Sequence, residues 1–217
     1  MEKIVWLWVG VSLPVLLLFD YIYATTRPLG NRTWRSAAKC GATFIAMSTA
    51  VIGTVLYDRP AESWVLVAAL LLCCIADFVI ECSFVGGIVS FALAHLAFIM
   101  YSLMVAKPVW YSVPIALILY GVVVLLFRRD LRQLGGLLVP MLLYPAALAA
   151  MTATAVALPF TASPRYAVFA IGAVLFGVSD MFVAKDAISG ITGAQREFAL
   201  LLYYGAVYLM ASVQLVG

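Results

Sequence analysis

Eight apolar blocks, each long enough to cross a lipid bilayer as a helix, constrain this chain more than any other feature. A span needs roughly 20 mostly apolar residues, with a range of about 17–25. The sequence therefore predicts spans at 4–24, 36–57, 63–81, 85–104, 108–127, 134–157, 166–184 and 197–215. Charged residues make up only 11% of the chain, whereas a soluble domain carries about a quarter. We predict an all-α, polytopic transmembrane helical bundle that forms a single integral membrane domain over residues 1–217.

Lys and Arg sort unevenly between the two faces that eight spans create. One face receives nine, namely Arg27, Arg32, Arg35, Lys39, Arg128, Arg129, Arg132, Lys185 and Arg196. The other receives four, namely Lys3, Arg59, Lys107 and Arg165. Because cytoplasmic loops carry the excess of positive charge, we expect a bacterial inner or plasma membrane protein with both termini outward. This charge belongs to loops and does not indicate a nucleic-acid partner.

A short internal similarity links the third and seventh spans. Residues 75–79 (Ile-Ala-Asp-Phe-Val) resemble residues 178–182 (Val-Ser-Asp-Met-Phe), and both segments lie near the cytoplasmic end of a span that runs in the same direction. Two parallel four-helix halves would explain this pattern.

Ionisable and phenolic residues gather at one depth in the predicted spans. A charge at the centre of a span costs at least ~2.5–3.5 kcal/mol, so such residues mark function by default. Those near the cytoplasmic ends come from five spans: Asp20, Lys39, Asp77, Glu81, Asp180, Tyr203 and Tyr204. His95, the single histidine, lies deeper, in the predicted span 85–104. This convergence predicts one polar cavity that opens toward the inner leaflet.

The same residues also have purely structural interpretations. Asp77 and Asp180 could hydrogen-bond across the bundle, Lys39 could extend to the interface, and His95 could be a satisfied core residue. Ser179 lacks the flanking glycines of a hydrolase nucleophile, and a chain with one histidine offers little for a catalytic triad. One histidine and no thiolate cluster also favour no metal site, so we expect no metal and no cofactor.

The order of several short motifs resembles the lysoplasmalogenase-like membrane family of the YhhN type. The resemblance covers some 165 residues and rests on these positions: Lys39, Ala76-Asp77, Ala94-His95, Pro140, Tyr144, Met151, Gly172 to Phe176, Ser179-Asp180 and Tyr203-Tyr204. The chain departs from the family at Cys40, Ala76 and Val207, where the family usually has Pro, Gly and Gln.

This resemblance implies an enzyme that hydrolyses the vinyl ether bond of lysoplasmalogens to a fatty aldehyde and a glycerophospho head group. Protonation of the alkene carbon remote from the oxygen leaves an oxocarbenium ion, which water then attacks. Paired carboxyl groups can divide the acid and anion roles, as in glycoside hydrolysis. We expect Asp77 and Asp180 to form the catalytic pair, with His95 and Tyr204 orienting them. Lys39 is expected to hold the lipid phosphate, and the other predicted substrate-binding residues are Glu81, Tyr144, Ser179 and Tyr203.

Two other classes of function fit the same residues. Carboxylates, a histidine and a repeat are also features of a proton-coupled transporter, although the outer halves of the spans offer little polar lining. The three departures from the family pattern fit a non-catalytic lipid-binding protein, and a hydrolase of another ether or ester lipid is a close neighbour. The expected partners are a lysophospholipid and membrane lipid, and the sequence does not give the oligomeric state.

Overall fold

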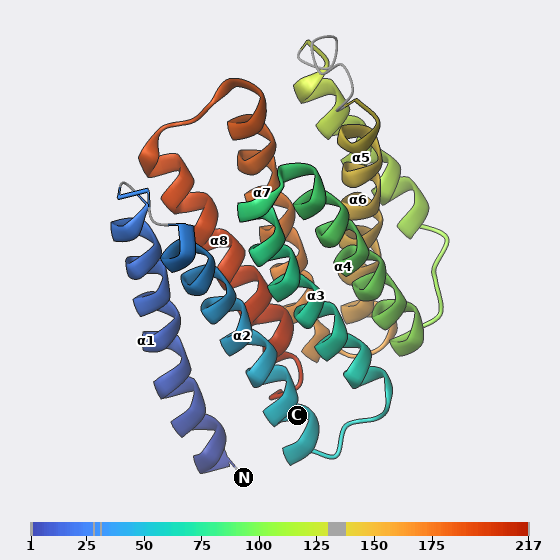
Figure 1. The fold of residues 1–217 in the computed structure, drawn as a ribbon. Coiled ribbons are helices and arrows are strands. Elements are labelled where there is room, and N and C mark those ends of the chain that lie inside the picture. The colour runs from blue at the N-terminus through green and yellow to red at the C-terminus, as the bar shows by residue number, and fades with distance from the viewer. Residues whose placement is uncertain (1, 28, 31, 130–137, 217) are drawn as a thin grey trace.

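The computed structural model describes residues 2–27, 29–30, 32–129 and 138–216, and this part of the chain is almost entirely helical (Figure 1). Its helices are α1 (Glu2–Thr26), α2 (Arg32–Leu56), α3 (Glu62–Cys82), α4 (Phe84–Val105), α5 (Ser112–Phe127), α6 (Leu138–Thr161), the 3₁₀ turn η3 (Pro164–Tyr166), α7 (Ala167–Ser189) and α8 (Gly193–Ser212). The predicted all-α bundle is confirmed.

The helices follow the predicted apolar blocks, with shifts at several ends. Helix α5 begins at Ser112, later than the expected start of 108–127. Helix α8 begins at Gly193, before the expected 197–215, because the Thr192 side chain caps it in a reciprocal capping box with Gln195. Residues 134–137, the expected start of the sixth span, lie outside the described residues.

Six of the described helices are long and apolar enough to cross a membrane: α1, α2, α3, α4, α6 and η3–α7. Helix α5 is apolar but has 16 residues, a length of about 24 Å against a hydrocarbon core of about 30 Å. Helix α8 has 20 residues with Gln195, Arg196 and Glu197 near its start. The composition and lengths fit an integral membrane protein, and the count of eight spans stays a prediction.

Helices α2, α3, α4, α6, α7 and α8 pack in that order into a closed ring. Helix α1 lies outside the ring against α2 and α8, and α5 lies outside it against α6 (Figure 1). The segment α2–α3–α4 therefore lies half a turn around the ring from α6–α7–α8. Two four-helix halves would give this order, and the repeat stays a prediction. Asp77 on α3 and Asp180 on α7 lie on opposite sides of the ring.

Small residues let the helices of the ring approach closely. On α2, Ala42, Ala46 and Ala50 recur at every fourth position and are fully buried. On α7, Gly172 lies so near α8 that an added Cβ would be 2.7 Å from the carbonyl oxygen of Ala206. In lipid, where apolar burial provides little force between helices, close packing of this kind stabilises the bundle.

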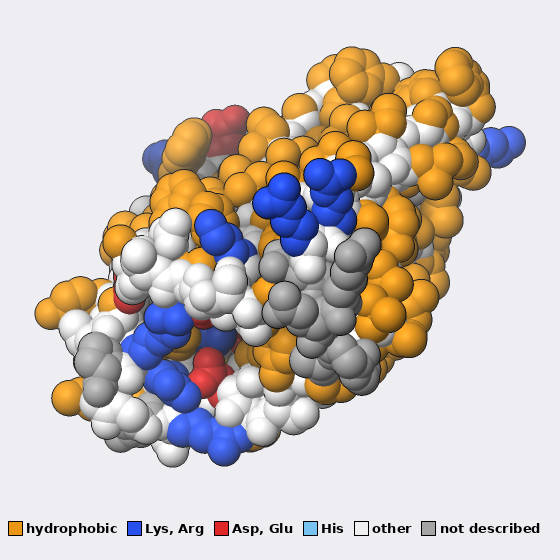
Figure 2. Space-filling view, turned by 90° about the horizontal axis from the view of Figure 1, so that it is seen from above, with side chains coloured by type: hydrophobic (Ala, Val, Ile, Leu, Met, Phe, Trp, Pro, Cys, Tyr) orange, Lys and Arg blue, Asp and Glu red, His pale blue; other side chains and the backbone are white. Residues whose placement is uncertain are grey.

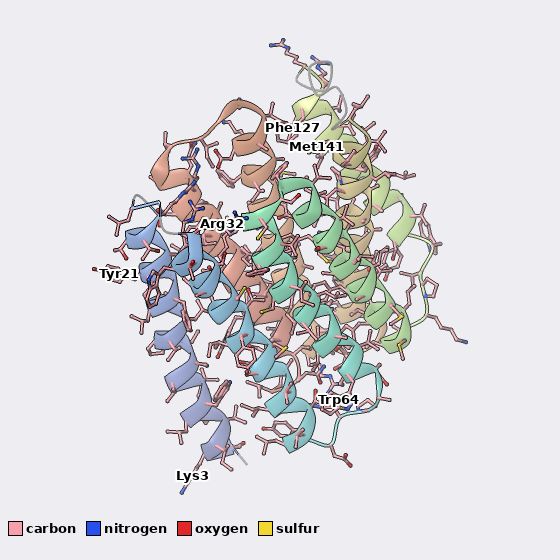
Figure 3. All side chains as sticks on the ribbon, viewed as in Figure 1. Lys3, Tyr21, Arg32, Trp64, Phe127 and Met141 are labelled. Carbon is pink, nitrogen blue, oxygen red and sulfur yellow. The ribbon has the colours of Figure 1, made fainter. Side chains whose placement is uncertain are left out.

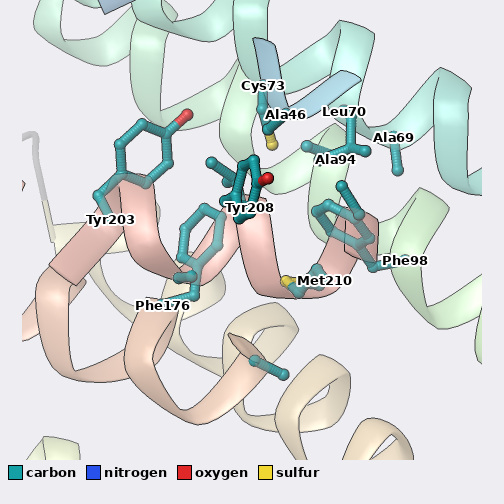
Figure 4. Packing of buried hydrophobic residues seen from close by; sticks show 14 of the residues in the cluster. Ala46, Ala69, Leu70, Cys73, Ala94, Phe98, Phe176, Tyr203, Tyr208 and Met210 are labelled. Carbon is teal, nitrogen blue, oxygen red and sulfur yellow. The ribbon is translucent and has the colours of Figure 1, made fainter. Parts of the chain in front are cut away.

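Large side chains fill the lower part of the ring. Leu70, Phe98 and Met210 are fully buried, and Figure 4 shows all three within the packed interior. Near the lower end, the buried Gln214 amide accepts a hydrogen bond from Ser63 (3.1 Å) and donates one to the Tyr101 hydroxyl (3.2 Å). The lower end is therefore closed by packing and hydrogen bonds.

The two ends of the molecule differ in charge as the sequence predicts. Both chain ends lie at the lower end, where Figure 3 labels Lys3, whereas Arg32 lies at the upper end. From the helix directions, the upper end also carries most of the other described basic residues: Arg27, Arg35, Lys39, Arg128, Arg129, Lys185 and Arg196. Arg132 lies outside the described residues, and the cytoplasmic orientation of this end stays a prediction.

Candidate active site

A cavity of about 470 Å³ lies at the upper end of the ring, and every α-helix contributes to its lining. Figure 2, which looks down on this end, shows Lys and Arg side chains gathered around a hollow in which acidic side chains are visible. The side formed by α1, α2 and α8 supplies polar residues, namely Tyr23, Arg27, Lys39, Arg196 and Tyr203. The side formed by α4, α5 and α6 is mostly apolar, with Phe84, Ile88, Phe91, Val123, Phe127 and Met141. The cavity is therefore amphipathic.

Asp77 reaches the cavity from α3 and is only 2% exposed. Its Oδ2 accepts hydrogen bonds from the Thr43 hydroxyl (2.5 Å) and from the Tyr203 hydroxyl (2.9 Å). Since Thr43 lies on α2 and Tyr203 on α8, this one oxygen links three neighbouring helices. The second oxygen, Oδ1, has no hydrogen-bond partner in the described part of the chain.

Asp180 reaches the same cavity from α7, and its side chain is 12% exposed. The Tyr144 hydroxyl donates to its Oδ2 at 2.5 Å. His95 Nε2 lies 3.1 Å from that hydroxyl and 3.7 Å from Oδ2. A proton on Nε2, assigned from the network, lets His95 donate to Tyr144 while Tyr144 donates to Asp180. His95 is fully buried, and within the described residues its Nδ1 has no partner.

Aromatic rings connect these two hydrogen-bonded groups. The Phe176 ring centroid lies 5.3 Å from that of Tyr203 and 5.1 Å from that of His95, edge to face in both cases. Phe91 contacts both Phe176 (6.2 Å) and Tyr203 (5.8 Å) in the same manner. The two carboxyl groups thus share surroundings of low polarity, where electrostatic interactions are stronger than in water.

Lys39 lies on the polar side of the cavity, where it is held by an acid and a ring. Its Nζ is 3.0 Å from Glu81 Oε1 and 5.3 Å from the centroid of the Tyr23 ring. The other oxygen of Glu81 is 2.9 Å from Arg35 Nη2. The Glu81 side chain is 9% exposed, so its charge is well shielded from water and is compensated by two cations.

A second ion pair lies at the upper rim, between the end of α7 and the start of α8. Arg196 donates from Nε to Asp186 Oδ2 and from Nη2 to Asp186 Oδ1, both at 2.6 Å. Gly190, at φ +74°, ends α7 between these two residues and turns the chain toward the cap of α8. Both members of the pair line the cavity. The pair therefore joins the two helices across the rim.

Comparison with protein-family models matches the YhhN family over residues 34–213. The chain belongs to the YhhN family. The match begins in α2 and runs just past the end of α8, so it includes both carboxyl groups and all of their hydrogen-bond partners. Searches of curated proteins and of solved structures gave no match. The predicted resemblance to this family is confirmed.

Most of the predicted site residues of this YhhN-family chain come together. Six line the cavity: Lys39, Asp77, Tyr144, Ser179, Asp180 and Tyr203. His95 and Glu81 lie behind that lining, in contact with Tyr144 and Lys39 respectively. The Ser179 hydroxyl donates to the Ala199 carbonyl at 2.8 Å, which ties α7 to α8.

Tyr204 occupies a different place from its neighbour Tyr203. It does not line the cavity, it is fully buried, and its hydroxyl has no hydrogen-bond partner in the part of the chain that the structure describes. Tyr203, which the sequence predicts to bind substrate, is the tyrosine that donates to Asp77.

Two features of the YhhN-family site were missed in the sequence. Thr43 follows Lys39 by four residues, so a shared helix face was a usable signal. The Asp186–Arg196 pair forms across a helix end, and nothing in the spacing of these residues shows that they meet. Within the described residues, no three His, Cys, Asp or Glu side chains gather to hold a metal ion.

Proposed function

We propose that this YhhN-family protein hydrolyses the vinyl ether bond of lysoplasmalogen-type lysophospholipids, releasing a fatty aldehyde and a glycerophospho head group. The observation that carries the proposal is that Asp77 of α3 and Asp180 of α7 face one amphipathic cavity. Both carboxyl groups are largely buried and each is fixed by tyrosine. Such pairs of acids in distinct surroundings are typical of acid–base catalysis.

The cavity suits a lipid with one hydrocarbon chain. Its volume of about 470 Å³ falls in the range of small-molecule sites, about 300–1,000 Å³. The chain would lie against the apolar side, near Phe127 and Met141 at the upper ends of α5 and α6 (Figure 3). The head group would lie at the polar rim, which leaves the vinyl ether between the two carboxyl groups.

The reaction requires one proton donor, one anion and one water. One carboxyl group donates its proton to the alkene carbon remote from the oxygen, and the other stabilises the oxocarbenium ion that forms. Water then adds to the carbon attached to the oxygen and gives a proton to a carboxylate. The resulting hemiacetal loses its hydroxyl proton and breaks its bond to the glycerol oxygen, which is protonated as it leaves. The sum consumes one water and regenerates both carboxyl groups.

Tyr203 and Tyr144 are positioning residues in this proposal. Each holds the Oδ2 of its aspartate, so that the remaining oxygen of each is directed to the substrate. His95 supports Tyr144 from behind. Ser179 contributes to the wall of the cavity, and its hydroxyl is already engaged by the backbone of α8.

A transporter is disfavoured by the lower half of the ring. Alternating access opens a binding site near the midplane to each side in turn, so polar groups are expected to continue toward both ends of the bundle. Below the carboxyl groups lie the buried rings of Phe98 and Phe169 and the hydrogen-bonded Gln214. A pocket at that end of the bundle, lined by Ser102, Lys107 and Thr161, measures only about 10 Å³.

The proposal is tested by aldehyde release from a lysoplasmalogen by the purified full-length protein. Asp77→Asn and Asp180→Asn keep the shape of each side chain and remove its acid, and we expect each to lower kcat by about 10²–10⁴-fold. Glu62→Gln, on α3 with Asp77 but at the opposite end, is the matched control and should retain full activity.

Three outcomes would contradict the proposal. Turnover retained by either aspartate variant would remove that residue from the chemistry. A wild-type protein that binds lysolipid, without aldehyde release from any vinyl ether, would favour the lipid-binding alternative. Uptake of a solute into proteoliposomes would favour transport.

A further inference from the structure

Three cations line the cavity at its polar rim, and two of them are already neutralised. Lys39 is paired with Glu81 at 3.0 Å. Arg196 is held by both oxygens of Asp186 at 2.6 Å. A phosphate that approached either cation would compete with a carboxylate already in contact with it. Each side chain keeps further N–H donors, but its positive charge is already balanced by a carboxylate, so it attracts a second anion less strongly.

Arg27 is the third cation, and its side chain has a different environment. It follows the last residue of α1, lines the cavity and is partly buried. In the part of the chain that the structure describes, no acid and no hydrogen-bond acceptor contacts its guanidinium. Tyr23, one helical turn earlier, lines the same wall and lies against Lys39. Among the described residues that line the cavity, Arg27 is thus the cation without an ion pair of its own, although Asp186, already bound to Arg196, is near enough to interact with its charge.

We propose that Arg27 is the phosphate-binding residue of this site, and that the group it binds is the phosphodiester of a lysophospholipid head group. The inference rests on the proposed lysolipid substrate and replaces the expectation that Lys39 holds the phosphate. A guanidinium presents a planar fork of N–H donors that matches two phosphate oxygens. Lys39, fixed by Glu81 and Tyr23, instead shapes the wall beside Asp77.

Because the cavity has a polar and an apolar side, phosphate binding at Arg27 would also orient the lipid. An anion held by Arg27 at the rim places the hydrocarbon chain toward Phe127 and Met141 on the other side. The reverse orientation would put the phosphate against apolar side chains, where an unpaired charge is costly. Arg27 would thus distinguish lipids that carry a phosphate from neutral glycerol ethers of the same chain length.

Binding of two saturated lipids to the full-length protein in detergent tests this inference. The first is a 1-O-alkyl lysophosphatidylethanolamine and the second is the corresponding 1-O-alkylglycerol, which lacks the phosphate. Because neither contains a vinyl ether, the measurement does not depend on turnover. We expect Arg27→Gln to weaken binding of the phospholipid by at least about tenfold, as for a lost hydrogen bond to a charged group, and to leave the alkylglycerol unchanged.

Arg32→Gln is the matched control, since Arg32 lies at the same end, at the start of α2, but does not line the cavity. Unchanged phospholipid binding by Arg27→Gln would overturn the inference, as would equal weakening for both lipids. Inorganic phosphate is the third probe: Arg27-dependent phosphate binding without discrimination between the two lipids would identify a free-anion site instead. If Arg27-dependent lipid binding is found without vinyl ether cleavage, the phosphate site stands and the proposed reaction fails.

Discussion

Tyr144→Phe removes the hydroxyl that links His95 to Asp180, and its effect on stability can be worked out from the contacts. A hydrogen bond between helices in a membrane protein contributes about 0.6 kcal/mol on average. The contribution of the Tyr144 hydroxyl should exceed that average. Without this hydroxyl, the fully buried His95 ring has no hydrogen-bond partner at either nitrogen within the described residues. A buried polar group left unsatisfied costs about 1–3 kcal/mol. We expect the free energy of unfolding to fall by about 1–3 kcal/mol.

The measurement is equilibrium unfolding in mixed detergent micelles, followed by circular dichroism. Tyr21→Phe is the matched control, since Tyr21 is 66% exposed on α1 and no side-chain hydrogen bond of its hydroxyl is found in the described structure. In the aldehyde-release assay, Tyr144→Phe should turn over more slowly than the wild type, because Asp180 loses the donor that fixes its Oδ2. Tyr21→Phe should keep wild-type turnover.

A double-mutant cycle with His95→Leu tests the reasoning directly. Once His95 is replaced by an apolar side chain, removal of the Tyr144 hydroxyl no longer leaves a buried ring unsatisfied. The two substitutions together should therefore cost less than the sum of the single costs, by about 0.5–3 kcal/mol. Strict additivity, or a Tyr144→Phe protein as stable as Tyr21→Phe, would refute the proposed chain from His95 through Tyr144 to Asp180.

Two further substitutions test the frame around the site. Gly172→Ala should lower the free energy of unfolding by about 1–3 kcal/mol, because the new Cβ would lie 2.7 Å from a carbonyl oxygen of α8. Gly177→Ala on the same helix is the control and should change stability little, because its Cβ would meet nothing closer than 3.8 Å. Equal effects of the two substitutions would contradict the close packing of α7 against α8. Glu81→Gln leaves the Lys39 ammonium without its counterion, and we expect a loss of about 1–3 kcal/mol in the unfolding assay, smaller than the ~3–5 kcal/mol of a fully buried pair. A Glu81→Gln protein as stable as Glu62→Gln would show that this ion pair contributes nothing.

The class of fold followed from the sequence because lipid imposes a simple rule on length and polarity. Every backbone group in the hydrocarbon core must be satisfied within its own helix, so apolar blocks of sufficient length predict helices directly. The boundaries that shifted are those set by local contacts. The Thr192–Gln195 box, for example, adds residues to the start of α8 that are too polar to be read as part of an apolar block.

The site was predicted in part, since depth can be read from a sequence while rotation about a helix axis is harder to read. Asp77, Asp180 and Tyr203 were expected at one depth, and all three line the cavity. Tyr203 and Tyr204 are adjacent, however, and so point about 100° apart on α8. Their positions in the ring decide which one meets Asp77, and that depends on how α8 packs against α2 and α7.

Asp77 and Asp180 lie on helices half a turn apart in the ring, and the differences between their surroundings can give them different roles. Two identical halves would give Asp77 and Asp180 identical surroundings, and identical acids would have no basis for one to donate a proton while the other stays ionised. In this chain the two carboxyl groups have different hydrogen-bond partners and different exposure. Asp77 receives two hydroxyl donors and is almost inaccessible, whereas Asp180 receives one donor backed by a histidine and is more exposed. Tyr203→Phe removes a donor from Asp77, and Tyr144→Phe removes the donor from Asp180. We expect one variant to shift mainly the acid limb of the pH–rate profile and the other mainly the alkaline limb. Equal shifts of both limbs by both variants would contradict the division of roles.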